Sequence, residues 1–436
     1  MTAPAESAPT ESAPAETAPA LTVPEPVRDL VMLLARERLS PEAVPPRESM
    51  GLPAYIYDLV SLDAHAARIR AALPDEVEFY YAVKANPDPA VLRTVAGHAD
   101  GLEVSSSGEL GHVAREAGGQ RRAFGGPGKS VTELAAAVRA RATLHVESPH
   151  ELRLLASVLR DQGSAATADV LLRVNLDVPV PESAGLVMGG AGPFGMDCAG
   201  LAECAEILAR AGGGPRGLRL RGLHAHLASG LDVDDALRAA AGVLRFAREW
   251  CARQEVRDPV ITLGGGMTVD YRRPEETFDW ERYGRGLAQL AGAGPPGETL
   301  RVEPGRAVTA YCGWYATRVL DVKRNGGAAF AVVAGGTHHL RTPAAKGHSQ
   351  PFAVFGVSGD EGWPHPWARP GVTDTPVTVT GQLCTPKDVL AREVRVGRVR
   401  AGDVIVFGLA GAYAWNISHT RFLMHPEPGF HYLGRD

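Results

Sequence analysis

From Ser61 to Glu303 the chain alternates between short apolar runs and longer amphipathic stretches. The apolar runs are rich in Val and Leu, whereas the stretches between them carry aliphatic residues three and four positions apart, as helices do. The pattern predicts eight strands: Val77–Lys84, Gly101–Ser106, Arg122–Gly126, Thr143–Glu147, Asp169–Leu176, Leu218–His226, Pro259–Gly265 and Thr299–Glu303. It also predicts helices between them, such as Pro89–His98, Gly108–Ala117, Val131–Arg141, Leu201–Ala211 and Asp234–Gln254. Repeated strand and helix units of this kind predict an α/β fold, an N-terminal (β/α)8 barrel of the TIM type.

After Arg306 the chain no longer shows apolar residues at the helical spacing of three and four positions. The apolar runs that follow are separated by Gly and Pro, which predicts a C-terminal β-rich domain, a β-barrel or sandwich. These runs are Tyr315–Val322, Ala328–Val333, Val377–Leu383 and Val404–Gly408.

Residues 1–26 consist mainly of Ala, Pro, Glu, Ser and Thr. This composition has too little apolar content to offset the entropy of ordering, so we expect a disordered tail. A helix at Val27–Leu39 and a strand at Ala54–Asp58 are predicted next. The expected organisation is therefore a tail at 1–26, a barrel at 59–305, and a β-rich domain formed by 27–58 together with 306–436.

Composition narrows the class of protein. Of the 436 residues, 45% are hydrophobic and 22% are charged, and the formal charge of −5 predicts no broad basic face for nucleic acid. The five cysteines include no C-x-x-C pair, which favours a reducing cytoplasm and argues against a zinc site. Because no apolar run approaches roughly 20 residues, we expect no membrane span. The missing ligand pattern predicts no bound metal, and the ordinary composition and charge favour a small-molecule substrate.

The residues that suggest chemistry follow the ends of the predicted strands. In a barrel of this type the active site lies at the C-terminal ends of the strands. The residues at or near such ends are Lys84, Glu103, Arg173, His226, Gly264–Gly266 and Glu303. The hydrophobic pattern alone thus predicts that they meet at one mouth.

Two adjacent strand ends favour a phosphate-bearing ligand. Backbone at Gly264–Gly266 can approach a phosphate closely and donate N–H bonds, although a purely steric role for the glycines is equally open. The next strand ends in Glu303, and Arg306 follows three residues later. A guanidinium suits phosphate and a carboxylate suits a protonated ring nitrogen, while a simple salt bridge between the two is the alternative.

Seven motifs occur in order along roughly residues 50–436: Tyr81–Asn86, Glu103–Leu110, His224–His226, Gly264–Gly266, Glu303–Arg306, Gly381–Cys384 and Gly411–Tyr413. Together they resemble the motifs of the fold-type III decarboxylases that depend on pyridoxal 5′-phosphate (PLP), the group of diaminopimelate, ornithine and arginine decarboxylases. The resemblance implies an alanine-racemase-like barrel, PLP as cofactor and the loss of carbon dioxide from an amino acid.

The resemblance also implies a role for each motif residue. The catalytic residues are Lys84, which binds the cofactor's aldehyde, His226, which stacks on its ring, and Cys384, which a partner subunit supplies as proton donor. The implied cofactor-binding residues are Lys84, Glu103, Arg173, His226, Ser229, Gly264, Gly265, Gly266, Glu303, Gly305, Arg306 and Tyr413. Glu303 would keep the ring nitrogen protonated, whereas alanine racemases use an arginine there. The implied active site is shared across a head-to-tail homodimer.

Several of these residues also admit plainer structural roles. Lys84 suits a surface ion pair, His226 a core histidine and Cys384 a buried small apolar position. Glu103 suits the cap of the next helix, and Arg173 suits an ion pair within the barrel. A catalytically silent regulatory homologue is the alternative of another class.

The substrate loops depart from the pattern of the diamino-acid decarboxylases. Cys384 is followed by Thr385 and Lys387, where those enzymes carry an acidic residue that holds the distal amine of the substrate. In place of their Asp-Gly-Gly turn, the segment 334–343 brings His338, His339 and Arg341. The five residues His338, His339, Arg341, Thr385 and Lys387 are therefore the predicted substrate-binding set, suited to an acidic substrate. A solvated loop or contacts within the β-rich domain are the alternatives.

With the ending 414–426, these segments resemble a narrower branch that decarboxylates a citryl-diaminopropionate conjugate in the biosynthesis of carboxylate siderophores. We therefore expect an acidic or conjugated amino acid of secondary metabolism as substrate. The alternatives are a free diamino acid (diaminopimelate, ornithine or lysine) and an aminoacyl group bound to a carrier protein, which would then be a further partner.

Overall fold

The computed structural model describes residues 21–36, 51–163, 165–177, 186–187, 189–209, 217–357, 363 and 365–434. The chain divides into two compact units. The barrel unit contains Tyr55–Trp314, Leu409–Ile417 and the described residues from Phe430 onward, and the β unit contains Tyr315–Gly408, Ser418–Gly429 and the described residues before Tyr55. Leu409–Ile417 thus groups with the barrel, although the sequence pattern placed it in the β-rich part. Residues 1–20 of the expected tail lie outside the described residues.

Eight parallel strands close the barrel in the order β10-β11-β2-β3-β4-β5-β6-β8. They are β2 (Val77–Ala82), β3 (Gly101–Val104), β4 (Arg121–Phe124), β5 (Thr143–Val146), β6 (Ala168–Arg173), β8 (Leu218–His224), β10 (Val260–Thr262) and β11 (Thr299–Val302). Each corresponds to one of the eight predicted strands, so the predicted barrel is confirmed. Their central residues are almost fully buried, as in Phe79, Leu102, Leu144 and Leu172.

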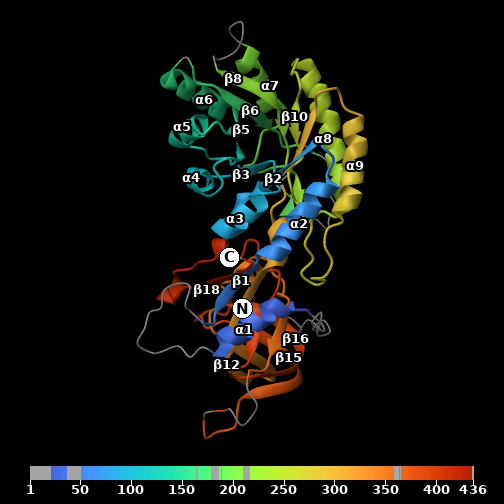
Figure 1. Cartoon of the computed structure of the whole chain (residues 1–436). Coiled ribbons are helices and arrows are strands. Elements are labelled where there is room, and N and C mark those ends of the chain that lie inside the picture. Colours follow the sequence, from blue (N-terminus) through green and yellow to red (C-terminus); the bar gives the residue numbers. More distant parts are fainter. Residues whose placement is uncertain are drawn as a thin grey trace, which may run out of the picture. The chain divides into compact units, whose positions relative to one another are not determined.

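Helices surround these strands on the outside (Figure 1). They are α2 (Leu59–Ala72), α3 (Pro89–Ala96), α4 (Ser107–Glu116), α5 (Val131–Arg139), α6 (Pro149–Gln162), α7 (Cys198–Ala209), α8 (Val233–Arg253), α9 (Trp280–Gly292) and the short α10 (Arg306–Thr309). An Asp or Ser side chain caps the N-terminus of α2, α3, α4, α5, α6, α8 and α9 by accepting a backbone N–H. Each cap satisfies a donor that the first helical turn leaves open, so these loops end where the sequence supplies Asp or Ser.

The β unit is built around a mostly antiparallel sheet in the order β14-β17-β12-β13-β15-β16. The strands are β12 (Gly313–Asn325), β13 (Ala328–Val333), β14 (Phe352–Phe355), β15 (Gly371–Thr380), β16 (Val389–Arg400) and β17 (Val404–Phe407). Gly326 and Gly327 form the tight β12–β13 turn with φ of +57° and +81°, a conformation that favours glycine. The predicted β-rich fold is confirmed.

The remaining elements are short or lie near the chain ends. They are α1 (Glu25–Arg36), β1 (Ala54–Asp58), β7 (Leu186–Val187), β9 (Ala228–Ser229), α11 (Thr342–Lys346) and β18 (Gly429–Leu433). The predicted N-terminal helix is present but begins two residues earlier, at Glu25, and positions 37–39 of that prediction lie outside the described residues.

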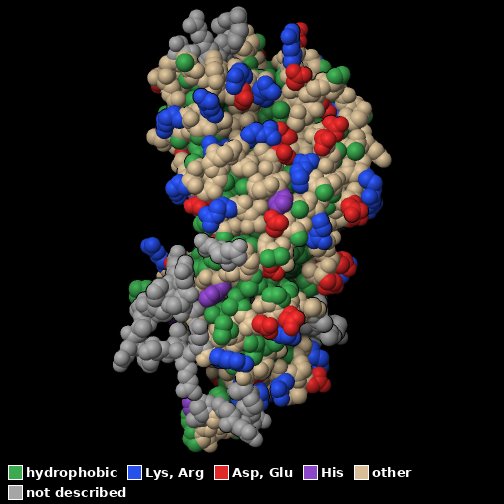
Figure 2. Space-filling view, viewed as in Figure 1, with side chains coloured by type: hydrophobic (Ala, Val, Ile, Leu, Met, Phe, Trp, Pro, Cys, Tyr) green, Lys and Arg blue, Asp and Glu red, His purple; other side chains and the backbone are tan. Residues whose placement is uncertain are grey.

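The surface shows no segregation of charge on the face in Figure 2, where basic and acidic side chains are interspersed over both units. In the part of the chain that the structure describes, no helix is long and apolar enough to cross a membrane. All five cysteines are free thiols, and Cys198 and Cys384 are the exposed ones.

Candidate active site

Lys84 lies in a single 3-10 turn, Val83–Ala85, directly after strand β2. Its Nζ is 2.5 Å from Oε2 of Glu103, which follows on the neighbouring strand β3 and is 4% exposed. Burial disfavours the ammonium, but the attraction and hydrogen bond of Glu103, with Tyr413 and Glu303, outweigh it and raise the pKa of Lys84. The lysine is therefore held as a cation against a buried carboxylate.

The backbone of this turn is fixed by a segment more than 300 residues away in sequence. Asn86 Nδ2 donates to the carbonyl of Gly411 at 2.9 Å, and the N–H of Tyr413 donates to the carbonyl of Ala85 at 2.7 Å. Asn416 Nδ2 donates to the carbonyl of Lys84 itself at 2.7 Å. The position of the lysine therefore depends on the segment Gly411–Asn416.

Glu303 follows strand β11 and is 8% exposed. Its Oε2 accepts a hydrogen bond from His224 Nε2 at 3.0 Å, whereas its Oε1 has no hydrogen-bond partner among the described residues. His145 Nε2 lies 3.7 Å from that second oxygen. The donor atoms of His145, His224 and Glu303 lie within 4.8 Å of one another, a spacing that also suits a metal ion, and the prediction of no metal remains a prediction.

His226 is held by the first glycines of the triple-glycine turn. The N–H of Gly265 donates to His226 Nδ1 at 3.1 Å, so Nδ1 carries no proton. Burial, then Lys84 and Arg173, lower the pKa of His226 to about 3, and the ring is neutral at pH 7. A β-carbon on Gly264, whose φ is +74°, would lie 2.5 Å from His226 Nδ1.

The other glycines of the turn are sterically required as well. A β-carbon on Gly265 would collide with the carbonyl of Glu303, and one on Gly266 with the carbonyl of Ala228, beside Ser229. The turn therefore permits the close approach of three strand ends, and this requirement is independent of any phosphate.

Arg306 begins the short helix α10 beside the same turn. Its Nη1 donates to the hydroxyl of Tyr271 at 2.7 Å, and its guanidinium lies 4.5 Å from the ring centroid of Tyr413. It makes no ion pair with Glu303 among the described contacts, so the simple salt bridge considered from sequence is not formed. Gly305 packs against the Lys84 turn, because a β-carbon there would lie 2.9 Å from that of Ala85.

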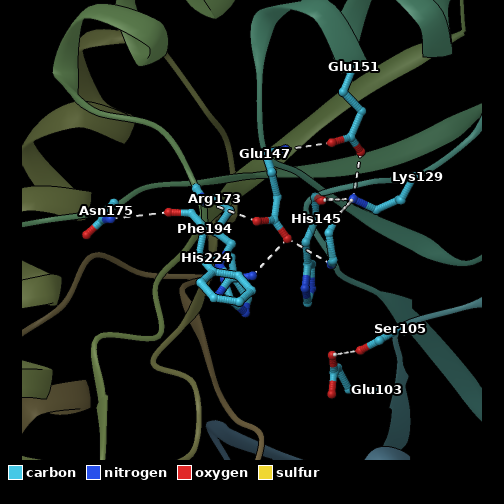
Figure 3. A network of polar contacts seen from close by, with 12 residues as sticks. Glu103, Ser105, Lys129, His145, Glu147, Glu151, Arg173, Asn175, Phe194 and His224 are labelled. Carbon is cyan, nitrogen blue, oxygen red and sulfur yellow. Dashed lines mark hydrogen bonds and ion pairs between the residues drawn. The ribbon is translucent and has the colours of Figure 1, made fainter. Parts of the chain in front are cut away.

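Arg173 ends strand β6 and pairs with Glu147, which follows strand β5 (Figure 3). Arg173 Nη1 is 2.8 Å from Glu147 Oε1, and the guanidinium lies 5.0 Å from the ring centroid of Phe194. Glu147 also accepts the backbone N–H groups of Gly126 and Gly195 at 2.8 and 2.9 Å. The carboxylate therefore fixes the direction of the arginine.

A second buried ion pair, between Lys129 and Glu151, is linked to Glu147 by a hydrogen bond (Figure 3). Lys129 Nζ is 2.7 Å from Glu151 Oε1 and donates to the carbonyl of His145 at 2.8 Å. Glu151 Oε2 accepts the N–H of Glu147 at 3.0 Å. Sequence reasoning missed Lys129, Glu147 and Glu151 as members of the site, although Glu147 ends a predicted strand just as Glu303 does.

The β unit contains a cavity of about 540 Å³. Its lining includes Arg341, Thr385, Lys387 and Arg392, with His348 and His419. None of the described lining residues is acidic, and Arg341, Lys387 and Arg392 make no ion pair with any residue that the structure describes. Three of the five predicted substrate-binding residues thus meet in one cationic cavity.

His338 and His339 lie in the interior of the β unit instead, at 0% and 2% exposure, and do not line that cavity. His339 contacts the hydroxyl of Tyr315 and the carbonyl of Pro426, both at 2.9 Å. Burial, with neighbouring His425 and His419, lowers the pKa of His338 to about 4. Contacts within the β-rich domain, the alternative considered from sequence, are what the structure shows for these two imidazoles.

Asp388 joins two loops of the cavity, one that contains Thr337 and one that contains Leu383. Its Oδ1 accepts the N–H of Thr337 at 2.6 Å and its Oδ2 accepts the N–H of Leu383 at 2.8 Å. The residue is 2% exposed, so it acts on the loops and not on solvent. Cys384, next along the second loop, is exposed and is therefore not the buried apolar position considered from sequence.

The structure thus has a closed barrel with a lysine and a buried carboxylate at its strand ends. Comparison with known families identifies the class of protein to which this arrangement belongs. Residues 59–310 match the family described as "Pyridoxal-dependent decarboxylase, pyridoxal binding domain". This match covers more than half of the chain, and the chain belongs to the pyridoxal-dependent decarboxylases, the carboxy-lyases that act on amino acids. The silent homologue considered from sequence finds no support in this membership.

Individual relatives narrow the comparison. The chain is 37% identical over 383 residues, 87% of its length and 93% of the relative, to 2-[(L-alanin-3-ylcarbamoyl)methyl]-2-hydroxybutanedioate decarboxylase of Staphylococcus aureus. It is 33% identical to a diaminopimelate decarboxylase of Deinococcus radiodurans, covering 91% of this chain and 93% of the relative. It is 30% identical to the L-glutamyl-[BtrI acyl-carrier protein] decarboxylase of Niallia circulans, covering 86% and 87%.

Solved structures agree on the fold. Diaminopimelate decarboxylase from Helicobacter pylori, complexed with L-lysine, superposes with a TM-score of 0.75 at 23% identity, covering 88% of this chain and 92% of that one. The fold is therefore that of the fold-type III decarboxylases, as the motifs predicted.

Proposed function

We propose that the chain decarboxylates an acidic amino-acid conjugate such as citryl-diaminopropionate in siderophore biosynthesis, with PLP bound at Lys84. The cationic cavity of the β unit carries the substrate part of this proposal, because its described lining offers Arg341, Lys387 and Arg392 without an acidic side chain. The name of the S. aureus relative describes a hydroxybutanedioate with free carboxylates, joined by an amide to an alanyl group. A free diamino acid would instead bring a further cation to this cavity.

The barrel mouth fits PLP on two observations. Glu303 presents a buried oxygen, Oε1, without a hydrogen-bond partner among the described residues, which suits a protonated ring nitrogen. The neutral imidazole of His226 is fixed by Gly265 N–H beside Lys84, which suits stacking on a cationic ring. When bound, PLP takes up the electron pair that the departing carboxylate leaves on the α-carbon.

The chain's own residues then divide the work. Lys84 Nζ, which lies 2.5 Å from Glu103 Oε2, would hold the cofactor's aldehyde. Arg306, stacked on Tyr413, binds the phosphate together with the N–H groups of the glycine turn and Ser229. Arg173 lies at the mouth of the barrel and is held there by its ion pair with Glu147.

We include a homodimer in this proposal, in which the partner subunit supplies Cys384 and the cationic cavity to each barrel mouth. An exposed thiol can deliver a proton to the α-carbon and recover one from solvent. The exposure of Cys384 and of the cavity cations supports this arrangement, since both then remain open to a second copy of the chain.

A substrate panel tests the proposal. Carbon dioxide release is measured from citryl-diaminopropionate and, at equal concentrations, from meso-diaminopimelate, ornithine, lysine and arginine. We expect kcat/KM for the conjugate to exceed that of each free diamino acid by at least about 100-fold, the result of two lost charge-assisted contacts. Turnover of a free diamino acid alone rejects the substrate, and absence of a visible cofactor band after PLP addition rejects the cofactor site.

A carrier-bound substrate is the second candidate, favoured by the similarity to the Niallia circulans enzyme. A phosphopantetheine-linked carrier is itself acidic at the linkage, which the cavity would also accept. Activity on a glutamyl group tethered to a carrier, with none on the free conjugate, would establish this candidate over the first.

A further inference from the structure

His224 is the only described side chain that hydrogen-bonds the carboxylate of Glu303. The two groups meet at the mouth of the barrel from strand β8 and from the end of β11, at 4% and 8% exposure. Nε2 of His224 lies 3.0 Å from Oε2 of Glu303, and Nδ1 of His224 has no partner among the described residues. One oxygen of the carboxylate is thus committed to this imidazole, and the other is left open.

The proton of His224 is located by this contact. An ionised carboxylate only accepts hydrogen bonds, so Nε2 must carry the hydrogen and Nδ1 must be bare in the neutral ring. Burial, followed by Arg173, His226 and Lys84, lowers the pKa of His224 well below its usual range. A neutral donor satisfies one oxygen of Glu303 without cancelling its charge.

His145 packs on the same pair from strand β5. Its ring centroid lies 4.2 Å from that of His224, and its Nε2 lies 3.7 Å from Oε1 of Glu303, beyond hydrogen-bond range (Figure 3 shows the two imidazoles side by side). Burial and the neighbouring His224 lower the pKa of His145 as well. His145 therefore confines His224 sterically and leaves Oε1 free.

We propose that His224, backed by His145, is a positioning residue that holds Glu303 with one oxygen bonded and the other aimed at the cofactor. The proposal rests on the assignment of Glu303 to the ring nitrogen of PLP in the preceding section. A neutral imidazole is the suitable donor here, since an imidazolium would compete with the protonated ring for the negative charge of Glu303.

Two replacements of His224 test this on the full-length, PLP-loaded enzyme. His224→Gln keeps an N–H at the position of Nε2, whereas His224→Leu fills similar space without a donor. We expect His224→Leu to lower kcat by about 10- to 100-fold, with KM nearly unchanged, and to shift the visible cofactor band. His224→Gln should restore the band and bring kcat to within about threefold of the parent. His145→Leu should have an intermediate effect on kcat, because it removes packing and no hydrogen bond.

Replacement of another buried histidine, His65, serves as the control for a general loss of stability. His65 contacts the carbonyl of Ala307 at 2.9 Å, so His65→Leu reports the cost of losing a buried imidazole contact. It should lower the melting temperature about as much as His224→Leu and leave the cofactor band in place. If His65→Leu moves the band equally, or if Gln and Leu at position 224 behave alike, the positioning role is overturned.

Glu303→Gln separates this inference from the proposed function. If Glu303→Gln leaves the band and kcat unchanged, the assignment of Glu303 to the ring nitrogen fails. If it changes both while His224→Leu changes neither, only the role of His224 fails. A zinc ion retained by the PLP-loaded enzyme and lost in His145→Leu would also overturn the proposal, because Glu303 would then be a metal ligand.

Discussion

At the barrel mouth, Lys84, Lys129 and Arg173 each pair with a carboxylate of the same unit, at 2.5, 2.7 and 2.8 Å. In the cavity of the β unit, by contrast, Arg341, Lys387 and Arg392 line a space whose described walls carry no acidic residue. These three cations of the mouth are thus neutralised by carboxylates of their own unit, whereas the described walls of the cavity offer its cations no such carboxylate. We therefore expect the first region to set the chemistry and the second to select the substrate.

Removing the lysine of the mouth is the most severe test of this division. Lys84→Ala should lower kcat by on the order of 10³-fold or more, because no other described amine lies beside Glu103 to bind the aldehyde. Carbon dioxide release and the visible cofactor band measure the effect. If Lys84→Ala keeps more than a tenth of the parent activity, the chemistry does not belong to the barrel mouth.

Breaking a charge pair of the mouth should cost folding free energy. Glu147→Gln leaves Arg173 buried without its carboxylate, which we expect to lower the free energy of unfolding by about 3–5 kcal/mol in urea titrations. Glu203→Gln is the matched control, since its pair with Arg153 is about half exposed, with side-chain exposures of 48% and 53%. The control should change stability by less than about 1 kcal/mol. Equal effects of the two variants would contradict the view that the buried pairs hold the mouth together.

Neutralising a cavity cation should act on substrate binding instead. Arg341→Gln and Lys387→Met should each raise KM for a carboxylate-bearing substrate about tenfold and leave the cofactor band unchanged, since each removes one charge-assisted contact of about 1.5 kcal/mol. Lys323→Met, an exposed cation of β12 outside the cavity, is the control for a general loss of charge. A drop in kcat with an unchanged KM would place these residues in the chemical step and end the division proposed above.

The last prediction concerns the acid stability of the β unit. The pKa of buried His338 is lowered to about 4, so between about pH 6.5 and pH 4 the unfolded chain binds a proton there that the folded one does not. The free energy of unfolding therefore falls as the pH is lowered through this window. His338→Leu should flatten the slope by about 1.4 kcal/mol per pH unit. An unchanged slope in His338→Leu would show that this histidine already takes up a proton in the folded protein.

Sequence reasoning located the barrel and most residues of its mouth because strand ends are marked by local pattern. Lys84, Glu303 and the glycine turn each follow an apolar run, and parallel strands bring such positions to one end of a barrel. The partners Glu147, Lys129 and Asn416 were missed because their importance lies in contacts across the fold. The hydrogen bond of Asn416 to Lys84, for example, spans 332 positions and leaves no periodic trace.

The histidines of the β unit show a different limit. His338 and His339 follow two glycines in a polar stretch, and we predicted that they bind the substrate, with a solvated loop or contacts within the β-rich domain as the alternatives. The structure buries both: His339 has partners in Tyr315 and Pro426. His338 packs against the rings of His339 and His425, and neither of its ring nitrogens is hydrogen-bonded among the described residues. Burial of a titratable side chain depends on such distant partners, which a single sequence does not display.

The three hydrogen bonds between the Lys84 turn and the segment Gly411–Asn416 also bear on the order in which the chain can complete its fold. The last barrel strand ends at Val302, whereas the hydrogen bond of Asn86 joins it to Gly411, which lies 325 positions further along the chain than Asn86. The nascent barrel therefore displays its lysine before the turn around it is locked. The turn that carries Lys84 can therefore reach its final geometry only after the segment Gly411–Asn416 has been synthesised.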